Sequence, residues 1–155
     1  MASFDKEQVT AILNQILEQE LAGVVRYTHY SFLVFGHGRI PIVSWLRDQA
    51  RESLAHAHQA GEMITHLGAY PSLEIGPLLD RHESNIDAIL REALAAEGKA
   101  LALYCALLDA VAARSVMLEE YARQLILAEE MHAGEVKKML RLPGSIAADF
   151  VPEGK

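Results

Sequence analysis

Proline and glycine divide this sequence into four long segments, and that division limits the fold more than any other feature. The loop signal "GHGRIP" ends the first segment, and "GAYPSLEIGP", with two prolines and two glycines, ends the second. A short break at "ARS" separates the third segment from the fourth, which ends near "LRLPG". We therefore expect four regular elements at about 5–36, 41–67, 82–113 and 115–142, with Pro41 in the first turn of the second and Ser115 capping the fourth.

The apolar residues within the segments recur with the period of a helix. In the first segment Val9, Leu13, Ile16, Val24 and Tyr27 fit the i, i+3/i+4, i+7 pattern. The third segment shows the same spacing, and there is almost no sign of the alternation that a β-strand would show. Helices of roughly 25–30 residues greatly exceed the average of about 11–12. The sequence therefore predicts an all-α fold of long helices, which is typical of a bundle.

The lengths of the three connections predict how the helices are arranged. The first and third connections are short, so each joins two helices into an antiparallel hairpin. The middle connection, roughly 68–83, is long enough to run the length of a bundle. Two antiparallel hairpins joined by one long crossover have the connectivity of a ferritin-like four-helix bundle. We expect residues 1–155 to form one such domain with a short C-terminal tail.

The composition disfavours several classes of protein. The chain has 155 residues, of which 51% are hydrophobic, and this suits one folded domain with a sizeable core. The net charge of −7 disfavours binding to nucleic acid or to an anionic membrane, and no apolar run approaches the ~18 residues of a membrane span. A single cysteine and a polar N-terminus without a signal peptide favour a cytoplasmic protein. We expect that cysteine, Cys105, to be a buried structural thiol.

Polar residues on the apolar faces repeat at a fixed distance along the chain. Three pairs of residues are each 77 positions apart: Glu20 and Glu97, Tyr27 and Tyr104, and Glu52 and Glu129. The two glutamates of each hairpin are 32 positions apart in both halves of the sequence. In antiparallel hairpins this spacing puts paired residues at the same height, so a pseudo-two-fold axis would bring all four glutamates to one level of the core.

Four buried glutamates at one level need compensating positive charge. Two divalent cations would supply it, and histidines at the same level would complete the coordination as neutral nitrogen ligands. One glutamate from each of two helices, with a Glu/His pair from each of the other two, is the pattern of di-iron and di-manganese carboxylate proteins. Carboxylate and imidazole ligands without cysteine favour iron or manganese over structural zinc. The expected metal ligands are Glu20, Glu52, His56, Glu97, Glu129 and His132.

The second helix departs from this pattern by one residue. The fourth segment pairs glutamate and histidine three positions apart, whereas Glu52 precedes His56 by four, and Ser53 stands where the pattern requires glutamate. A pair at i and i+4 still shares a helix face, and a local π-bulge would bring it into register. Coordination by His56 is therefore compatible with the sequence, and the alternatives are His58 or no nitrogen ligand from this helix.

Other polar and aromatic residues have simpler interpretations. Tyr27 and Tyr104 each follow a glutamate by seven positions, and we expect both to pack in the core with the hydroxyl bonded to a buried carboxylate, a redox role being the alternative. Trp45 is expected to anchor the core or a subunit interface. The remaining residues of this kind are expected at the surface or in loops: His29, His37, His58, His66 and His82, with Glu18, Glu119, Glu120 and Glu130 as exposed charges.

The motifs around these residues resemble those of bacterioferritin and of the wider superfamily of ferritin-like di-iron carboxylate proteins. "EQELAGVVRY" resembles the first-helix motif, "ESLAHA" the second and "EEMHAGE" the fourth, and Glu97 matches the third-helix glutamate. The resemblance covers most of the chain. It implies that Glu20 and the two histidines are terminal ligands, whereas Glu52 and Glu129 bridge the two metal ions.

Two departures from bacterioferritin change what the resemblance implies. In that family the haem-binding methionine follows the second-helix glutamate, but Ser53 and Leu54 stand here, so no haem is expected at this position. Bacterioferritin also ends in a fifth helix that lines the channels of its cage, whereas this chain ends in the short tail "GSIAADFVPEGK". The resemblance therefore implies a homo-oligomer of any size from a dimer to a cage.

The resemblance implies a ferroxidase that oxidises iron(II) with dioxygen or peroxide and serves iron oxidation, storage or detoxification. It implies two iron ions per subunit, with manganese as the alternative metal, and catalytic roles for Tyr27 and Tyr104. A manganese or iron peroxidase or catalase-like enzyme is a second interpretation, although the cysteine pairs of rubredoxin-type sites are missing. A third is a non-catalytic oligomeric bundle, which the spacing of Glu52 and His56 favours. A DNA-protecting cage is disfavoured because the termini lack a lysine-rich tail.

Overall fold

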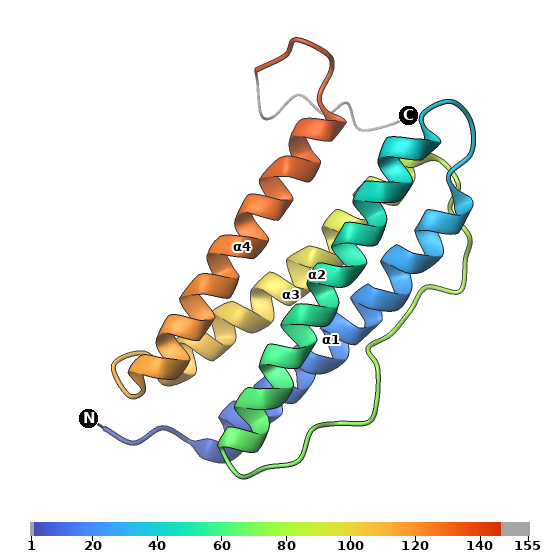
Figure 1. Cartoon of the computed structure of the whole chain (residues 1–155). Coiled ribbons are helices and arrows are strands. Elements are labelled where there is room, and N and C mark those ends of the chain that lie inside the picture. The colour runs from blue at the N-terminus through green and yellow to red at the C-terminus, as the bar shows by residue number, and fades with distance from the viewer. Residues whose placement is uncertain (1, 147–155) are drawn as a thin grey trace.

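The computed structural model describes residues 2–146, which form four α-helices and, over that range, no β-strand (Figure 1). The helices are α1 (Lys6–Leu33), α2 (Arg39–His66), α3 (Ile86–Val111) and α4 (Val116–Leu140). Each is 25 to 28 residues long, so the expected all-α bundle of long helices is confirmed. None of these helices is long and apolar enough to cross a membrane.

Side-chain caps determine where three of the helices begin. Asp5, Asn85 and Ser115 each accept a hydrogen bond from the backbone N–H three residues ahead, at 3.1, 3.1 and 3.3 Å. The cap at Ser115 is the expected one. The cap at Asn85 starts α3 at Ile86, later than the expected start near residue 82, because the crossover extends up to the capping residue.

The start of α2 also differs from the expected position at Pro41. The Arg39 N–H donates to the Gly36 carbonyl oxygen at 3.2 Å, and this turn leads directly into the helix two residues earlier. Proline is tolerated in the first helical turn because its missing N–H would have no partner there. Pro41 therefore lies within the first turn of α2 rather than at its first position.

Two antiparallel hairpins, α1–α2 and α3–α4, pack against each other through α1 and α3 (Figure 1). Over the described helices no Cα atom of α2 lies within 8 Å of one in α4, so these two helices meet through side chains. The long connection from α2 to α3 runs along the outside of the bundle, shown in green in Figure 1. The expected connectivity of two hairpins and one crossover is confirmed.

Polar contacts hold the crossover against α1. The Gly76 N–H donates to the Glu18 carbonyl oxygen at 2.8 Å. The Asn14 side chain bonds both the Tyr70 carbonyl oxygen and the Ser72 N–H, at 3.3 and 2.7 Å. A Cβ atom at position 76 would lie 3.1 Å from the Glu18 oxygen, so glycine permits this close approach. The crossover therefore follows α1 and lies away from α4 (Figure 1).

Two clusters of buried apolar side chains fill the bundle, and a polar layer separates them. In α1 the first cluster ends at Leu17 and the second begins at Tyr27, and Glu20 lies between them. The same gap occurs in α2, between Ala50 and Ala57. Burying charged groups between two apolar layers is unfavourable unless they have partners, so this layer is the candidate site.

Cys105 is exposed, and the expectation of a buried thiol is wrong. Its neighbours on the inner face of α3, Tyr104 and Leu107, are both fully buried. Adjacent residues on a helix point about 100° apart, so a buried Tyr104 turns the next side chain toward the surface. The stretch is apolar because Tyr104 and Leu107 are buried in the core, and not because the thiol is.

Candidate metal centre

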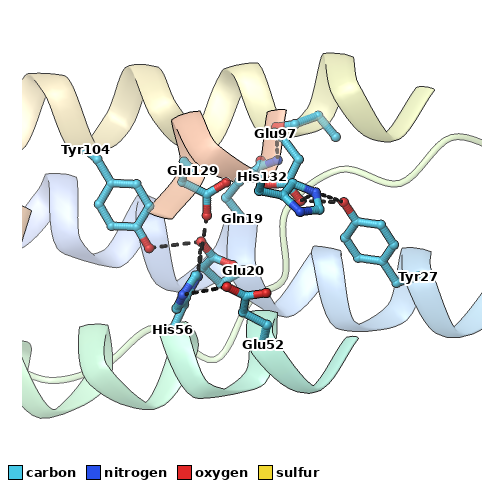
Figure 2. A network of polar contacts seen from close by, with 10 residues as sticks. Gln19, Glu20, Tyr27, Glu52, His56, Glu97, Tyr104, Glu129 and His132 are labelled. Carbon is cyan, nitrogen blue, oxygen red and sulfur yellow. Dashed lines mark hydrogen bonds and ion pairs between the residues drawn. The ribbon is translucent and has the colours of Figure 1, made fainter. Parts of the chain in front are cut away.

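Five of the six expected ligands converge in the polar layer. Glu20 from α1, His56 from α2, Glu97 from α3 and both Glu129 and His132 from α4 point toward one another (Figure 2). Their side chains are between 4 and 13% exposed. Each lies on the inward stripe of its helix, so the packing that buries the apolar residues also buries these polar ones. The five residues form two groups.

The first group consists of Glu20, His56 and Glu129. The His56 Nδ1 atom is 3.5 Å from a Glu20 carboxylate oxygen and 3.4 Å from a Glu129 oxygen. One donor atom from each of the three residues lies within 4.8 Å of the other two, which suits a single metal ion. The second carboxylate oxygen of Glu129, Oε2, is buried and has no hydrogen-bond partner. A cation bound beside this oxygen and the two further donors would give the oxygen a partner.

The second group consists of Glu97 and His132, and Tyr27 lies against both. The Tyr27 hydroxyl donates to Glu97 Oε1 at 2.6 Å and is 3.2 Å from His132 Nε2. The same nitrogen is 3.9 Å from Glu97 Oε1. The second group therefore offers one carboxylate and one imidazole of its own, one carboxylate fewer than the first group.

The two tyrosines occupy equivalent positions in the two hairpins (Figure 2). The Tyr104 hydroxyl of α3 donates to Glu20 of α1 at 2.9 Å, and the Tyr27 hydroxyl of α1 donates to Glu97 of α3 at 2.6 Å. Each tyrosine thus bonds a glutamate of the other hairpin, as the 77-residue repeat requires. The expected hydrogen bond from a core tyrosine to a buried carboxylate is present at both positions.

Glu52 joins neither group. Its side chain is 49% exposed, and its carboxylate is 3.9 Å from His56 Nε2, the ring nitrogen that faces away from the first group. Ser53 is only 5% exposed and faces the interior instead. Because a helix turns by about 100° per residue, a side chain at position 52 cannot share the inward direction of position 53.

Burial changes the protonation of these residues. Desolvation raises the pKa of Glu20, and desolvation together with the nearby Glu129 carboxylate raises the pKa of Glu97 to about 8. Burial opposes the charged form of His56, but hydrogen bonds to Glu129 and Glu20 outweigh it and raise the pKa of His56 to about 10. At neutral pH the metal-free cluster therefore holds protons on Glu97 and His56, and a divalent cation would displace them.

An aromatic layer covers the second group. The Trp45 ring stacks on the His132 ring, with 5.8 Å between centroids and 8° between planes, and Tyr27 meets both rings edge-on. Stacking restricts the orientation of the imidazole. The sequence predicts an anchoring role for Trp45 but not this contact, because spacing along one helix does not show which side chains meet across two helices.

Outside the site, two glutamates expected at the surface are half-buried. The crossover packs on the backbone of Glu18, and the Glu119 carboxylate accepts a hydrogen bond from the Ala113 N–H at 2.8 Å. Two of the outer histidines also meet: His29 Nε2 and His82 Nδ1 are 3.0 Å apart and connect α1 to the crossover. None of these contacts reaches either group of the candidate site.

Comparison with known proteins agrees with this architecture. Residues 10–144 match the family model described as "Ferritin-like domain". A ferritin-like, diiron-carboxylate protein of Bacillus anthracis str. Ames is 22% identical, with a TM-score of 0.82 over 90% of this chain and 100% of that chain. The Rhodobacter capsulatus bacterioferritin, described with a metal-free dinuclear site and a haem iron, is 25% identical, with a TM-score of 0.79 over 88% and 85%. A dodecameric thioferritin of Bacteroides fragilis is 18% identical, with a TM-score of 0.79 over 89% and 87%.

No curated protein matches the chain in sequence. The family model nevertheless spans all four helices and the crossover, and the structural neighbours cover most of the chain. Helix order and crossover are thus parts of one shared architecture. The chain belongs to the ferritin-like domain family.

Proposed function

We propose that this protein is a ferroxidase-type enzyme that binds two iron(II) ions per chain and oxidises them with dioxygen or peroxide. The observation that carries the proposal is the buried first group beside the second, with an unpartnered oxygen on Glu129. Membership of the ferritin-like family and the di-iron and bacterioferritin neighbours support an iron-related function. Iron(II) is the substrate in this proposal, and its product would serve storage or detoxification.

The donor set of the two groups fits iron. Three carboxylates and two imidazoles form a mixed oxygen and nitrogen set without thiolate, which suits iron or manganese. The first group would hold one ion, and the second group would hold the other. Glu129 lines the same small cavity as His56, Glu97 and His132, so its carboxylate lies next to both positions. Iron supplies the electrons, and the protein supplies binding, orientation and a dry environment.

The chain's own residues control protons and ligand orientation. Glu97 and His56 release protons when ions bind, since both hold them in the metal-free cluster at neutral pH. Tyr27 and Tyr104 donate hydrogen bonds to Glu97 and Glu20 and so hold these carboxylates in place. We assign both tyrosines to the catalytic machinery, because each is an oxidisable side chain in direct contact with a ligand.

We further propose that the protein works as a homo-oligomer and carries no haem at the second-helix position. The dodecameric thioferritin supports assembly, since it shares the fold over most of its length. At the position of the haem-binding methionine, Ser53 is buried against Gly23 and Leu54 is 40% exposed. Neither residue has a sulfur atom to offer to a haem iron.

Anaerobic titration with iron(II), followed by rapid mixing with air or peroxide, tests the proposed activity. We expect two ions per chain and rapid oxidation in the wild type, and loss of both in the Glu97→Ala, Glu129→Ala double variant. Glu130→Ala is the matched control, since Glu130 is exposed on the same turn of α4. Tight binding of manganese(II) without iron oxidation would favour a peroxidase or catalase-like enzyme. If the protein binds no stoichiometric metal, the proposal is wrong, and the repeat reflects only descent from a metal-binding protein.

A further inference from the structure

The histidines of the metal centre depart from the 77-residue repeat, because His56 and His132 are 76 positions apart. In α4, Glu129 lies three residues before His132, whereas the residue three before His56 in α2 is Ser53. Ser53 and Glu129 are 5% and 4% exposed, so the two positions are equivalent in burial as well as in their distance from the histidine of the same helix. α2 therefore presents a hydroxyl to the centre where α4 presents a carboxylate.

Glu52 stands behind His56 and not beside it. The His56 Nδ1 atom faces the first group at 3.4 and 3.5 Å, and the opposite ring nitrogen, Nε2, is 3.9 Å from the Glu52 carboxylate. A carboxylate near the outer nitrogen of a metal-binding histidine favours a proton there and leaves the inner nitrogen free for the metal. At 49% exposure, Glu52 is placed to orient His56 from the solvent side.

Close packing of α1 on α2 keeps the inner position of α2 small. A Cβ atom on Gly23 would lie 2.9 Å from the Ser53 Oγ, so glycine in α1 makes room for the serine. The cavity at this level has a volume of about 10 Å³, roughly that of one water-sized probe. Its α2 side is lined by Gln49, Glu52, Ser53 and His56. Of these, only Glu52 is a carboxylate, and it is the most outward.

The charges divide unequally between the two groups. The first group has two carboxylates, which together balance one divalent cation. The second group has a single carboxylate of its own, and Glu129 lines the same cavity as Glu97 and His132, so a second cation there would share Glu129 with the first. Two cations that share one carboxylate also repel each other across a short, weakly screened distance. The second ion is therefore less well neutralised than the first.

We propose that the centre is asymmetric, with three carboxylate and two imidazole ligands, and that it binds one divalent cation tightly in the first group and another more weakly in the second. Ser53 takes the place of the fourth carboxylate. Glu52 is a positioning residue that orients His56. The inference rests on the dinuclear site proposed above, but it concerns the affinity for each ion and not the oxidation step.

Titration of the full-length protein with Co²⁺ alone, followed by calorimetry and visible absorption, tests the asymmetry without a redox step. We expect two binding steps whose dissociation constants differ by at least about tenfold, or ~1.4 kcal/mol. Two steps of equal affinity in the wild type would overturn the proposal.

Substitution of Ser53 tests the missing carboxylate directly. Ser53→Glu is expected to tighten the second step about tenfold, because it restores the fourth carboxylate. Ala55→Glu is the matched control, since it adds the same charge at an exposed position of α2 and should leave both steps unchanged. An unchanged second step in a folded Ser53→Glu protein, as judged by far-UV circular dichroism, would contradict the proposal. If this variant does not fold, the wild-type steps and the Glu52 variants still decide.

Substitution of Glu52 separates an orienting carboxylate from a ligand. Glu52→Ala is expected to weaken the first step by about tenfold, as typical for a residue that orients a metal-bound histidine. Glu52→Gln keeps an acceptor for the His56 Nε2–H and should restore most of that affinity. Loss of the second step in Glu52→Gln would mean that Glu52 swings inward as the fourth ligand, and the proposal would be wrong.

These results also separate the inference from the proposed function. A protein that binds Co²⁺ in two unequal steps but does not oxidise iron(II) would keep the asymmetry and refute the ferroxidase. Rapid iron oxidation with two equal Co²⁺ steps would support the ferroxidase and refute the asymmetry.

Discussion

The two hairpins of the bundle follow the same sequence plan but complete it differently. In both, a tyrosine seven residues after the first glutamate bonds a glutamate of the other hairpin. The α3–α4 hairpin contributes Glu97, Glu129 and His132 to the polar layer. The α1–α2 hairpin contributes Glu20 and His56, and its Glu52 side chain lies outside that layer. The difference is confined to a single turn of α2, at Glu52 and Ser53.

In that turn, helix geometry gives two adjacent residues very different exposure to solvent. The carboxylate at position 52 is 49% exposed, and the serine next to it is buried. A shift of one residue rotates a side chain by about 100°, which is enough to move it from the core to the edge of the bundle. A count of matching residues would treat the hairpins as equal, whereas the direction of the side chains separates them.

Removal of the carboxylate within reach of both groups should have the largest effect. Glu129→Ala is expected to lower Co²⁺ affinity and the iron(II) oxidation rate by about 100-fold or more, beyond the 10–100-fold typical of residues that only orient ligands. Glu52→Gln, its counterpart at the 77-residue spacing, should change either quantity by less than about threefold, because an acceptor remains behind His56. Calorimetry and stopped-flow absorbance measure both. Equal losses would show that the hairpins contribute equivalent ligands.

Removal of each tyrosine hydroxyl should weaken the group that it serves. Tyr104→Phe and Tyr27→Phe each leave a buried carboxylate without its donor, so each is expected to lower the free energy of unfolding by about 1–2 kcal/mol. Tyr104→Phe should alter the first Co²⁺ step, and Tyr27→Phe the second. Urea unfolding of the metal-free protein measures the stability. A change in the same Co²⁺ step for both variants would argue against two distinct groups.

The stability of the metal-free protein should fall as pH rises from about 6.5 to 9. The pKa of Glu97 is raised to about 8 and that of His56 to about 10, so the folded state binds protons that the unfolded state releases at lower pH. We expect a decrease in Tm of roughly 3 °C or more, or about 1 kcal/mol. Calorimetric scans across this range check it. Glu97→Gln should make the profile less steep below pH 8 and leave the decrease due to His56, which continues through pH 9.

Tryptophan fluorescence should respond mainly to metal binding in the second group, and this is the smallest of the expected effects. Trp45 is the only tryptophan, and it stacks on His132. The second equivalent of Co²⁺ is therefore expected to quench its emission more than the first. Zn²⁺, which lacks partly filled d orbitals, is the control for effects of binding alone. Stronger quenching by the first equivalent would mean that the ions fill the groups in the opposite order.

Much of the fold follows from the sequence because its signals are local. Proline and glycine mark the connections, and the period of the apolar residues identifies the helices. Connection lengths then leave few ways to arrange four helices, and the structure has the expected one. The inward glutamates could be predicted in the same way, since they share the spacing of the apolar stripe.

What the sequence leaves open depends on contacts between helices and on exact rotation. Glu52 is exposed and Ser53, the next residue along α2, is buried. A helical pattern that accepts spacings of both three and four residues from His56 cannot show which of the two faces the core. The stacking of Trp45 on His132 joins residues from different hairpins, with no signal in either segment. The apolar neighbours of Cys105 predict a buried thiol, but the helix turns this side chain outward. The sequence shows a serine three positions before His56, but only the structure shows that Ser53 is buried and faces the polar layer.

The separation of α2 from α4 has a consequence for how the protein unfolds. These helices meet through side chains, and the first group spans the gap with His56 on one side and Glu129 on the other. A bound ion would act there as a removable cross-link between hairpins that are otherwise joined through α1, α3 and the crossover. We expect backbone amides of α2 and α4 to exchange hydrogen more slowly in the loaded protein than in the metal-free one. The cooperativity of folding in this bundle would then vary with the supply of metal.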